Sequence, residues 1–365
     1  MAGLFDSYDL KGVTLRNRTV VSPMCQYMAT DGEINDWHRV HYSSFARGGA
    51  GLVIVEATAV SPEGRITWGD LGLWNDRQAE RLAPLARDIK HWGSAAGIQI
   101  AHAGRKASAN RPWEGDNHIP LGEPNSWETI APSPVAFGGN LLPRVPREMT
   151  PDDIARVQAD TVAAAVRARD AGFDWLQLHM AHGYLAQNFF SPISNRRTDR
   201  YGGSAENRAR YLLETFVAVR KVWPQDRPLQ VRLGVVEFDG DDERFFAESV
   251  ALLRQMKREG LDSVDVSLGF NTPDASIPWG ANFMGEIAQR VRRETGLPTT
   301  TSWYISEPKD AEALVRDEKV DFVSLARPFL ANPHWTHRAA RELGVENPDW
   351  NTLPAAYAHW LARYR

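Results

Sequence analysis

Eight short apolar segments recur along the chain, and longer segments with apolar residues at helical spacing separate them. Most of the eight are bounded by Gly, Asp or Pro, which is typical of parallel strands buried on both faces. They span residues 19–23, 52–57, 98–102, 175–179, 229–233, 264–268, 299–302 and 322–325. The pattern therefore predicts eight buried parallel strands.

The intervening helices have recognisable ends. A helix over 151–171 begins after Thr150, a suitable N-cap, and ends at Gly172. Further helices are expected at 76–92, 204–223, 243–259, 282–295, 308–316 and 333–343. Eight strand–helix units without a break in composition predict an α/β fold, a single (β/α)₈ TIM barrel that forms one domain over residues 1–365. A doubly wound sheet is the alternative, but no G-x-G-x-x-G follows any expected strand.

Two segments fall outside this alternation. Residues 2–16 precede the first strand and contain the turn LKGVTL, so we expect an N-terminal hairpin at the barrel floor. Residues 104–147, rich in Gly, Pro, Asn and Trp, form a long loop after the third strand. In a barrel such a loop emerges on the catalytic face.

Composition excludes several functions. The 365 residues carry 42 Lys and Arg against 46 Asp and Glu, a formal charge of −4, which disfavours nucleic acid as a partner. The single Cys25 excludes an intramolecular disulfide and a four-cysteine iron–sulfur cluster. No leader peptide or apolar run of membrane-spanning length is evident, so we expect a soluble cytoplasmic protein. The 13 Trp suggest an aromatic-lined pocket.

The strongest candidate chemistry lies in the segment HMAHGY, at the end of the fourth strand. His179 and His182 have three interpretations: metal ligands, two structurally satisfied histidines, or two donors to one ligand oxygen with Tyr184 as proton donor. No third ligand or H-E-x-x-H supports a metal site, and we expect none. Their place at a strand mouth favours the third interpretation.

Three further residues invite a functional interpretation. Arg232 interrupts the apolar strand LQVRLGV, so it needs either an ion-pair partner, for instance Glu56, or a group that develops negative charge. Arg327 follows the eighth strand, where barrels often bind phosphate, although a surface salt bridge is the alternative. Cys25 has no assignable His–Asn or His–Asp pair, so inert packing is expected rather than nucleophilic catalysis.

Around these residues the chain closely resembles the Old Yellow Enzyme family of FMN-dependent ene-reductases, and within it the thermophilic-type and xenobiotic-reductase branch. The resemblance runs from about Leu4 to the C-terminus. Its motifs occur in the family's order: SPMCQY (22–27), VEATAVSPEGRI (55–66), GIQIAHAGRKA (97–107), HMAHGYL (179–185) and SNRRTDRYGGSAENR (194–208).

The resemblance implies a role for each matching residue. The residues implied to contact non-covalent FMN are Ser22, Pro23, Met24, Cys25, Ala57, Gln99, Arg232, Ala326 and Arg327. Among them Cys25 would tune the flavin, Arg232 would stabilise its anionic reduced form, and Arg327 would bind the phosphate. His179 and His182 would hold the substrate carbonyl, and Tyr184 would donate the proton. The implied walls of the substrate pocket are Tyr27, Trp303 and Trp360.

The resemblance also implies an assembly and a reaction. A C-terminal arginine, here Arg363, would reach the neighbouring subunit's active site in a homodimer or dimer-based tetramer. The implied activity is NADPH- or NADH-dependent reduction of the C=C bond of α,β-unsaturated carbonyl compounds. The alternatives are a flavin reductase acting mainly on nitro compounds, nitrate esters or quinones, and a non-redox aldolase-type barrel. The aldolase-type barrel would need a lysine at a strand end, where none is expected.

Two positions depart from the family pattern. Family members commonly carry glycine where this chain has Tyr304 and Ala326, in the loops expected to surround the phosphate. Backbone N–H groups bind phosphate without glycine provided that the loop accommodates a Cβ.

Overall fold

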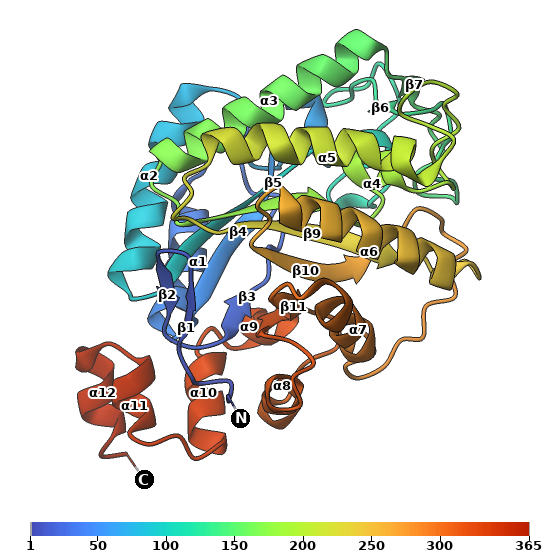
Figure 1. Ribbon diagram of the computed structural model, residues 1–365. Helices are drawn as coiled ribbons and strands as arrows, with labels where there is room; N and C mark the ends of the chain where they lie inside the picture. Colours follow the sequence, from blue (N-terminus) through green and yellow to red (C-terminus); the bar gives the residue numbers. More distant parts are fainter. Residues whose placement is uncertain (1, 365) are drawn as a thin grey trace.

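The computed structural model describes residues 2–364, and the eight expected strands close into one parallel barrel (Figure 1). Around the barrel the strands follow the order β10-β11-β12-β3-β4-β5-β8-β9. Their bounds are β3 Thr19–Val21, β4 Leu52–Ala59, β5 Ala95–Ala101, β8 Trp175–Met180, β9 Leu229–Val236, β10 Ser263–Leu268, β11 Thr299–Thr301 and β12 Phe322–Leu325. The predicted (β/α)₈ fold is confirmed.

The strands are buried because helices cover their outer face and side chains fill the interior. Part of that interior is polar. Gln99, Gln177 and Gln230 face one another in register on β5, β8 and β9. The Gln99 amide donates to Gln177 at 2.5 Å, and Gln177 donates to Gln230 at 2.7 Å. Gln230 in turn donates to the Thr300 hydroxyl at 3.3 Å, so each of the three amide nitrogens has at least one acceptor inside the barrel.

Seven helices of the outer ring agree with the expected ones within a few residues. They are α2 Asp76–His91, α3 Pro151–Asp170, α5 Ala205–Val222, α6 Asp242–Arg258, α7 Gly285–Thr295, α8 Pro308–Arg316 and α10 Trp335–Glu342. Thr150 caps α3 as predicted, because its side chain accepts a hydrogen bond from the backbone N–H of Asp153. Ser204 caps α5 in the same way.

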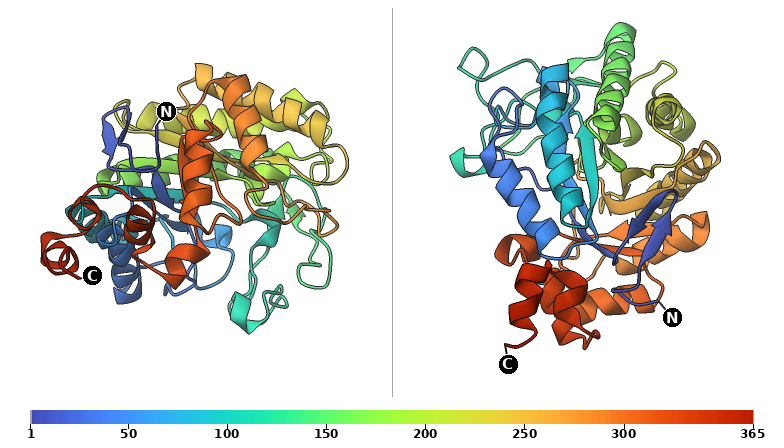
Figure 2. Two further views of the ribbon diagram at one scale, coloured as in Figure 1. Left: turned by 90° about the horizontal axis from the view of Figure 1, so that it is seen from below. Right: turned by 90° about the vertical axis from the view of Figure 1, so that its left-hand side faces the viewer.

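The sequence pattern missed α1 (Asp36–Arg47), the helix between β3 and β4. Its buried face consists of His38, Tyr42, Phe45 and Ala46, which is too polar to stand out as an apolar stripe. The shorter helices α4 (Leu185–Phe190), α9 (Arg327–Ala331), α11 (Pro348–Thr352) and α12 (Ala355–Leu361) were also not predicted. Figures 1 and 2 show α11 and α12 projecting beside α10 from the barrel wall.

The N-terminal hairpin is confirmed and consists of β1 (Tyr8–Leu10) and β2 (Val13–Leu15). Tyr8, Leu10 and Val13 pack on a buried cluster that includes Trp175 and Phe322 at the N-terminal ends of β8 and β12. The long loop lies at the other end of the barrel (Figure 1). It contains the short helices η2 (Gly104–Lys106) and η3 (Pro112–Glu114) and the strand pair β6 (Ile130–Ala131) and β7 (Arg147–Glu148). A further short helix, η1 (Pro62–Gly64), follows β4.

Within residues 2–364, no helix is both long and apolar enough to cross a membrane.

Candidate active site

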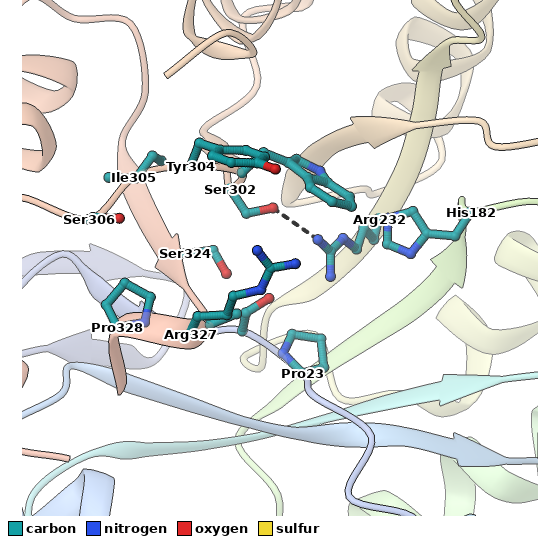
Figure 3. Close-up of a pocket in the computed structure, with 13 residues that line it drawn as sticks. Pro23, His182, Arg232, Ser302, Tyr304, Ile305, Ser306, Ser324, Arg327 and Pro328 are labelled. Carbon is teal, nitrogen blue, oxygen red and sulfur yellow. Dashed lines mark hydrogen bonds between the residues drawn. The ribbon is translucent and has the colours of Figure 1, made fainter. Parts of the chain in front are cut away.

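A cavity of about 260 Å³ opens at the carboxyl ends of β9, β11 and β12 (Figure 3). Seven residues predicted from the sequence line it: Ser22, Pro23, His182, Arg232, Trp303, Ala326 and Arg327. Tyr304, which was expected in a loop around the phosphate, also lines it, and the wall is completed by Ser302, Ile305, Ser306, Ser324 and Pro328. The barrel thus gathers residues from strand ends that are far apart in the sequence, as this fold does at its catalytic face.

His179 and His182 are brought together by a sharp turn after β8. The backbone at His182 and Gly183 is left-handed, with φ of 62° and 67°. Gly183 is required there, because a Cβ would lie 2.2 Å from the carbonyl oxygen of Phe270. The Nζ of Lys106 donates to the carbonyls of His182 and Phe270 at 2.8 and 2.9 Å. The turn leaves the imidazole rings 4.8 Å apart and nearly perpendicular.

Both imidazoles are neutral at neutral pH. Burial, and next the charge of Arg232, hold the pKa values of His179 and His182 well below their usual range. The backbone N–H of Ala181 donates to Nδ1 of His179 at 3.3 Å, and Nε2 of His182 lies 2.8 Å from the Ser267 hydroxyl. A neutral imidazole carries one N–H, so each ring has a single hydrogen to donate.

Tyr184 completes this cluster. Its ring lies 5.0 Å from that of His179 and 6.3 Å from that of His182. Burial raises the pKa of Tyr184 well above its usual value, so the phenol keeps its hydrogen. Tyr184 also lines, with Ala57, a second small cavity of about 10 Å³. The side chain is therefore a neutral phenol rather than a phenolate.

Arg232 is buried and partly neutralised. Its Nε lies 3.3 Å from the Asp265 carboxylate, and its Nη2 donates to the Ser302 hydroxyl at 2.9 Å (Figure 3 shows the latter bond). The suggested partner Glu56 is wrong, because β9 pairs with β10 and this register sets Arg232 beside Asp265. Glu56 on β4 instead faces His38 at 3.3 Å and accepts from the Gln26 backbone N–H.

The opposite end of the cavity suits an anion. Arg327 is exposed at the start of α9, and its side chain has no hydrogen bond or ion pair to any residue within 2–364. Figure 3 shows its guanidinium directed into the cavity beside Ser324, whose buried hydroxyl also lacks a partner in the described chain. A phosphate would supply the acceptors that these donors lack.

The two departures from the family pattern differ in their consequences. Ala326 has φ −111°, which any residue adopts, so glycine is not needed there. Trp303 and Tyr304 have φ of 81° and 52°, in the left-handed region that favours glycine. Their rings pack with Trp279 at centroid distances of 5.7 Å each. This aromatic packing offsets the backbone strain, which is of order 1 kcal/mol per residue.

The remaining predicted cofactor residues are not part of the cavity wall. Met24 and Cys25 follow Pro23 directly, and Gln99 belongs to the interior amide layer. Burial raises the pKa of the Cys25 thiol well above its usual range, while a hydrogen bond with Tyr27 opposes this shift. Cys25 is thus held as a protonated thiol.

The structure does not bring Trp360 and Arg363 to the cavity. The Trp360 side chain is 71% exposed on α12, and Arg363 donates to the carbonyl of His359 on the same segment. The expectation that Trp360 walls the pocket of its own subunit is therefore wrong, because α12 packs on α11 outside the barrel.

Sequence reasoning missed Asp265, Ser267, Ser302 and Lys106, although each contacts a site residue. Asp265 and Ser267 alternate with apolar residues along β10, a period-two signal that predicts polar side chains on the interior face. Lys106 lies within the motif GIQIAHAGRKA, but its contact with His182 depends on the path of a loop that the sequence does not reveal.

Residues 3–346 match the model of the NADH:flavin oxidoreductase / NADH oxidase family. The chain is similar to two proteins called NADPH dehydrogenase. One, from Geobacillus sp. (strain WCH70), is 41% identical over 94% of this chain and 95% of the relative. The other, from Geobacillus thermodenitrificans, is 42% identical over the same shares. Among solved structures, morphinone reductase in complex with tetrahydroNAD superposes with a TM-score of 0.78, at 29% identity over 94% of this chain and 91% of that one. The old yellow enzyme homologue from Zymomonas mobilis also superposes with a TM-score of 0.78, at 25% identity over 98% and 99%.

Proposed function

Because the chain belongs to the NADH:flavin oxidoreductase / NADH oxidase family, as its Old Yellow Enzyme motifs predicted, we propose that it reduces the C=C bond of α,β-unsaturated carbonyl compounds. The enzyme is an oxidoreductase that uses FMN, and NAD(P)H is its reductant. The proposal concerns the electron acceptor and the residues that bind it. The observation that carries it is the neutral His179–His182 pair in contact with a protonated Tyr184.

The charged and polar residues that line the cavity suit FMN. The unpartnered Arg327 and Ser324 suit a phosphate at one end, and Arg232 supplies a buried positive charge near the other. When bound, FMN supplies the two-electron transfer between NAD(P)H and the alkene. Ser22, Pro23, Met24, Cys25, Ala57 and Gln99 hold it from the adjacent strand ends in this proposal, with Ala326 beside the phosphate.

The chain's own residues then divide the work on the enone. His179 and His182 each donate an N–H to the carbonyl oxygen, which draws electron density from the β-carbon. Tyr184 holds the proton that the α-carbon receives, so NAD(P)H, H⁺ and enone give NAD(P)⁺ and the saturated carbonyl compound. Tyr27 and Trp303 enclose the substrate. Since reductant and enone use one cavity in turn, we expect ping-pong kinetics.

We further propose that the enzyme is a homodimer or dimer-based tetramer in which Arg363 acts in the neighbouring subunit. The C-terminal segment exposes four large aromatic side chains, Trp350, Tyr357, Trp360 and Tyr364. An exposed aromatic cluster of this kind is typical of a surface that another protein covers. In this arrangement Trp360 would meet the partner subunit's cavity rather than its own.

The first test is chemical. Purified protein should be yellow, should release one FMN per chain on denaturation, and should turn over cyclohex-2-enone with NADPH or NADH. Absence of FMN from the denatured supernatant would overturn the proposal. Turnover of quinones, nitro compounds or nitrate esters without enone turnover would instead favour the alternative flavin reductase.

A further inference from the structure

The Ser267 hydroxyl lies between two residues of the active site. Nε2 of His182 is 2.8 Å from the Ser267 oxygen, and Nε1 of Trp303 is 3.2 Å from it. Ser267 is fully buried near the carboxyl end of β10. The His182 and Trp303 rings also pack against each other, with centroids 5.8 Å apart and planes at 82°.

The hydrogens of this triad have one satisfactory arrangement. An indole N–H only donates, so Trp303 occupies one lone pair of the Ser267 oxygen. Among residues 2–364 the hydroxyl has no third partner, so its own hydrogen is satisfied only when it points to Nε2 of His182. The opposite arrangement, with the hydrogen on Nε2, would leave a buried hydroxyl hydrogen without an acceptor.

Nε2 of His182 is therefore the acceptor, and its neutral ring carries the hydrogen on Nδ1. His179 is held in the converse state, because the backbone N–H of Ala181 donates to its Nδ1 and leaves the hydrogen on Nε2. Within the described chain, Nε2 of His179 and Nδ1 of His182 have no hydrogen-bond partner. Neither atom is among the buried polar atoms without a partner, so neither is shut off from solvent. Both nitrogens thus face accessible space with an N–H to donate.

We propose that Ser267, oriented by the indole N–H of Trp303, is a positioning residue that holds His182 in the Nδ1–H tautomer. The two imidazoles then have opposite tautomers and each offers one N–H to the same ligand oxygen. That this oxygen belongs to an enone or a phenol rests on the proposed function. The tautomer assignment rests on the hydrogen bonds alone.

The direct test is the tautomer of His182 in the oxidised holoenzyme. With ¹⁵N-labelled histidine, a two-bond ¹H–¹⁵N correlation spectrum distinguishes the tautomers, and the signal lost in His182→Gln assigns the residue. The wild type should show the Nδ1–H tautomer, whereas Ser267→Ala should show a mixture or the Nε2–H form. A wild-type His182 with its hydrogen on Nε2 overturns the inference whether or not any variant folds.

The matched control is Ser263→Ala, which removes a buried hydroxyl from the same strand at its other end. The Ser263 hydroxyl has no partner among residues 2–364, so its loss should leave the His182 signal unchanged. Ser267→Thr keeps a hydroxyl and should restore the Nδ1–H form. Trp303→Phe removes the indole donor but adds no acceptor for the Ser267 hydrogen, so the Nδ1–H form should persist while Ser267 remains.

A second measurement connects the tautomer to ligand binding. Titration of the oxidised holoenzyme with p-hydroxybenzaldehyde should show binding weakened about fivefold or more in Ser267→Ala and unchanged in Ser263→Ala. Unchanged tautomer and unchanged affinity in Ser267→Ala would overturn the positioning role. A wild type that binds no phenol would contradict the proposed function instead, and the spectrum would still decide the tautomer.

Discussion

Tyr184, His179 and His182 lie in mutual contact, yet their hydrogens serve different steps in the proposed reaction. Burial keeps the phenol protonated and both imidazoles neutral. In the proposed function the imidazoles act on the oxygen of the ligand, whereas the phenol acts on carbon. The two roles can therefore be separated by substitution.

Tyr184→Phe should slow enone turnover by about 100-fold or more, because it removes the general acid. It should leave binding of p-hydroxybenzaldehyde and reduction of the flavin by NAD(P)H intact, and turnover of quinones should be spared. His182→Ala should instead weaken phenol binding at least about tenfold, since it removes an oxygen donor. Stopped-flow measurement of the two half-reactions distinguishes them. If Tyr184→Phe abolishes phenol binding and leaves enone turnover intact, the roles are reversed.

Arg232→Met should weaken FMN retention and lower the midpoint potential of the bound flavin by ~30 mV or more, because it removes the buried positive charge beside it. Spectroelectrochemical titration measures the potential, and chromatography of the denatured protein measures the FMN content. Unchanged values for both would remove the role assigned to Arg232.

Arg220→Met is the matched control for that substitution. Arg220 is as buried as Arg232 and also pairs with an aspartate, Asp262, at 3.0 Å. It does not line the cavity. Both variants should lose stability, since breaking a buried pair costs about 3–5 kcal/mol. Only Arg232→Met should change the flavin in the fraction that remains folded.

At the scale of elements, a buried histidine stabilises the turn that follows β5. Nδ1 of His102 accepts from the backbone N–H of Gly104 at 3.0 Å, which fixes the turn into the long loop. Burial lowers the pKa of His102 to about 4, partly opposed by Glu63 and assisted by Arg156. In the folded protein His102 therefore stays neutral at pH values at which it is protonated in the unfolded chain, where its pKa is about 6.5.

His102→Asn tests this element without removing the turn's acceptor, since an Asn oxygen can accept the same N–H. Below pH 6.5 the unfolded wild-type chain binds a proton that the folded state does not, so falling pH destabilises the wild type. The free energy of unfolding of the wild type, minus that of His102→Asn, should fall by about 1 kcal/mol from pH 6.5 to 5.5. Urea unfolding at the two pH values measures it. A difference that does not vary with pH would show that His102 does not titrate in this way.

At the scale of the whole molecule, the exposed C-terminal aromatic residues and Arg363 test the proposed assembly. Sedimentation should show a dimer or tetramer at micromolar concentration. Arg363→Ala should weaken substrate binding although the residue lies outside the cavity of its own subunit. A fully active monomer would rule this assembly out.

Mixed oligomers separate action in the neighbouring subunit from action within one subunit. When Arg363→Ala and His182→Ala chains are co-expressed, each mixed dimer should regain one working site, because the His182→Ala subunit supplies Arg363 to an intact cavity. Activity should therefore exceed that of either variant alone. No gain in the mixed dimers would place Arg363 in its own subunit or outside the reaction.

Sequence alone was enough for the barrel and for about half of the cavity wall. The strands are recognisable because burial on both faces demands continuous apolar runs, and their ends identify His182, Arg232 and Arg327 because this fold exposes strand ends at one face. The missed helix α1 shows the limit of the pattern, since it buries His38 and Tyr42 rather than an aliphatic stripe.

Long-range contacts were decided by the tertiary structure. Arg232 pairs with Asp265 rather than Glu56 because the closing order and register of the barrel put β10 beside β9, and neither is encoded in local spacing. The carbonyl of His182 in the left-handed turn accepts from Lys106 of a distant loop, and the Ser267 hydroxyl accepts from Trp303. Local periodicity reports which face of an element is buried, whereas the partner of a buried polar group depends on which elements the closed barrel sets side by side.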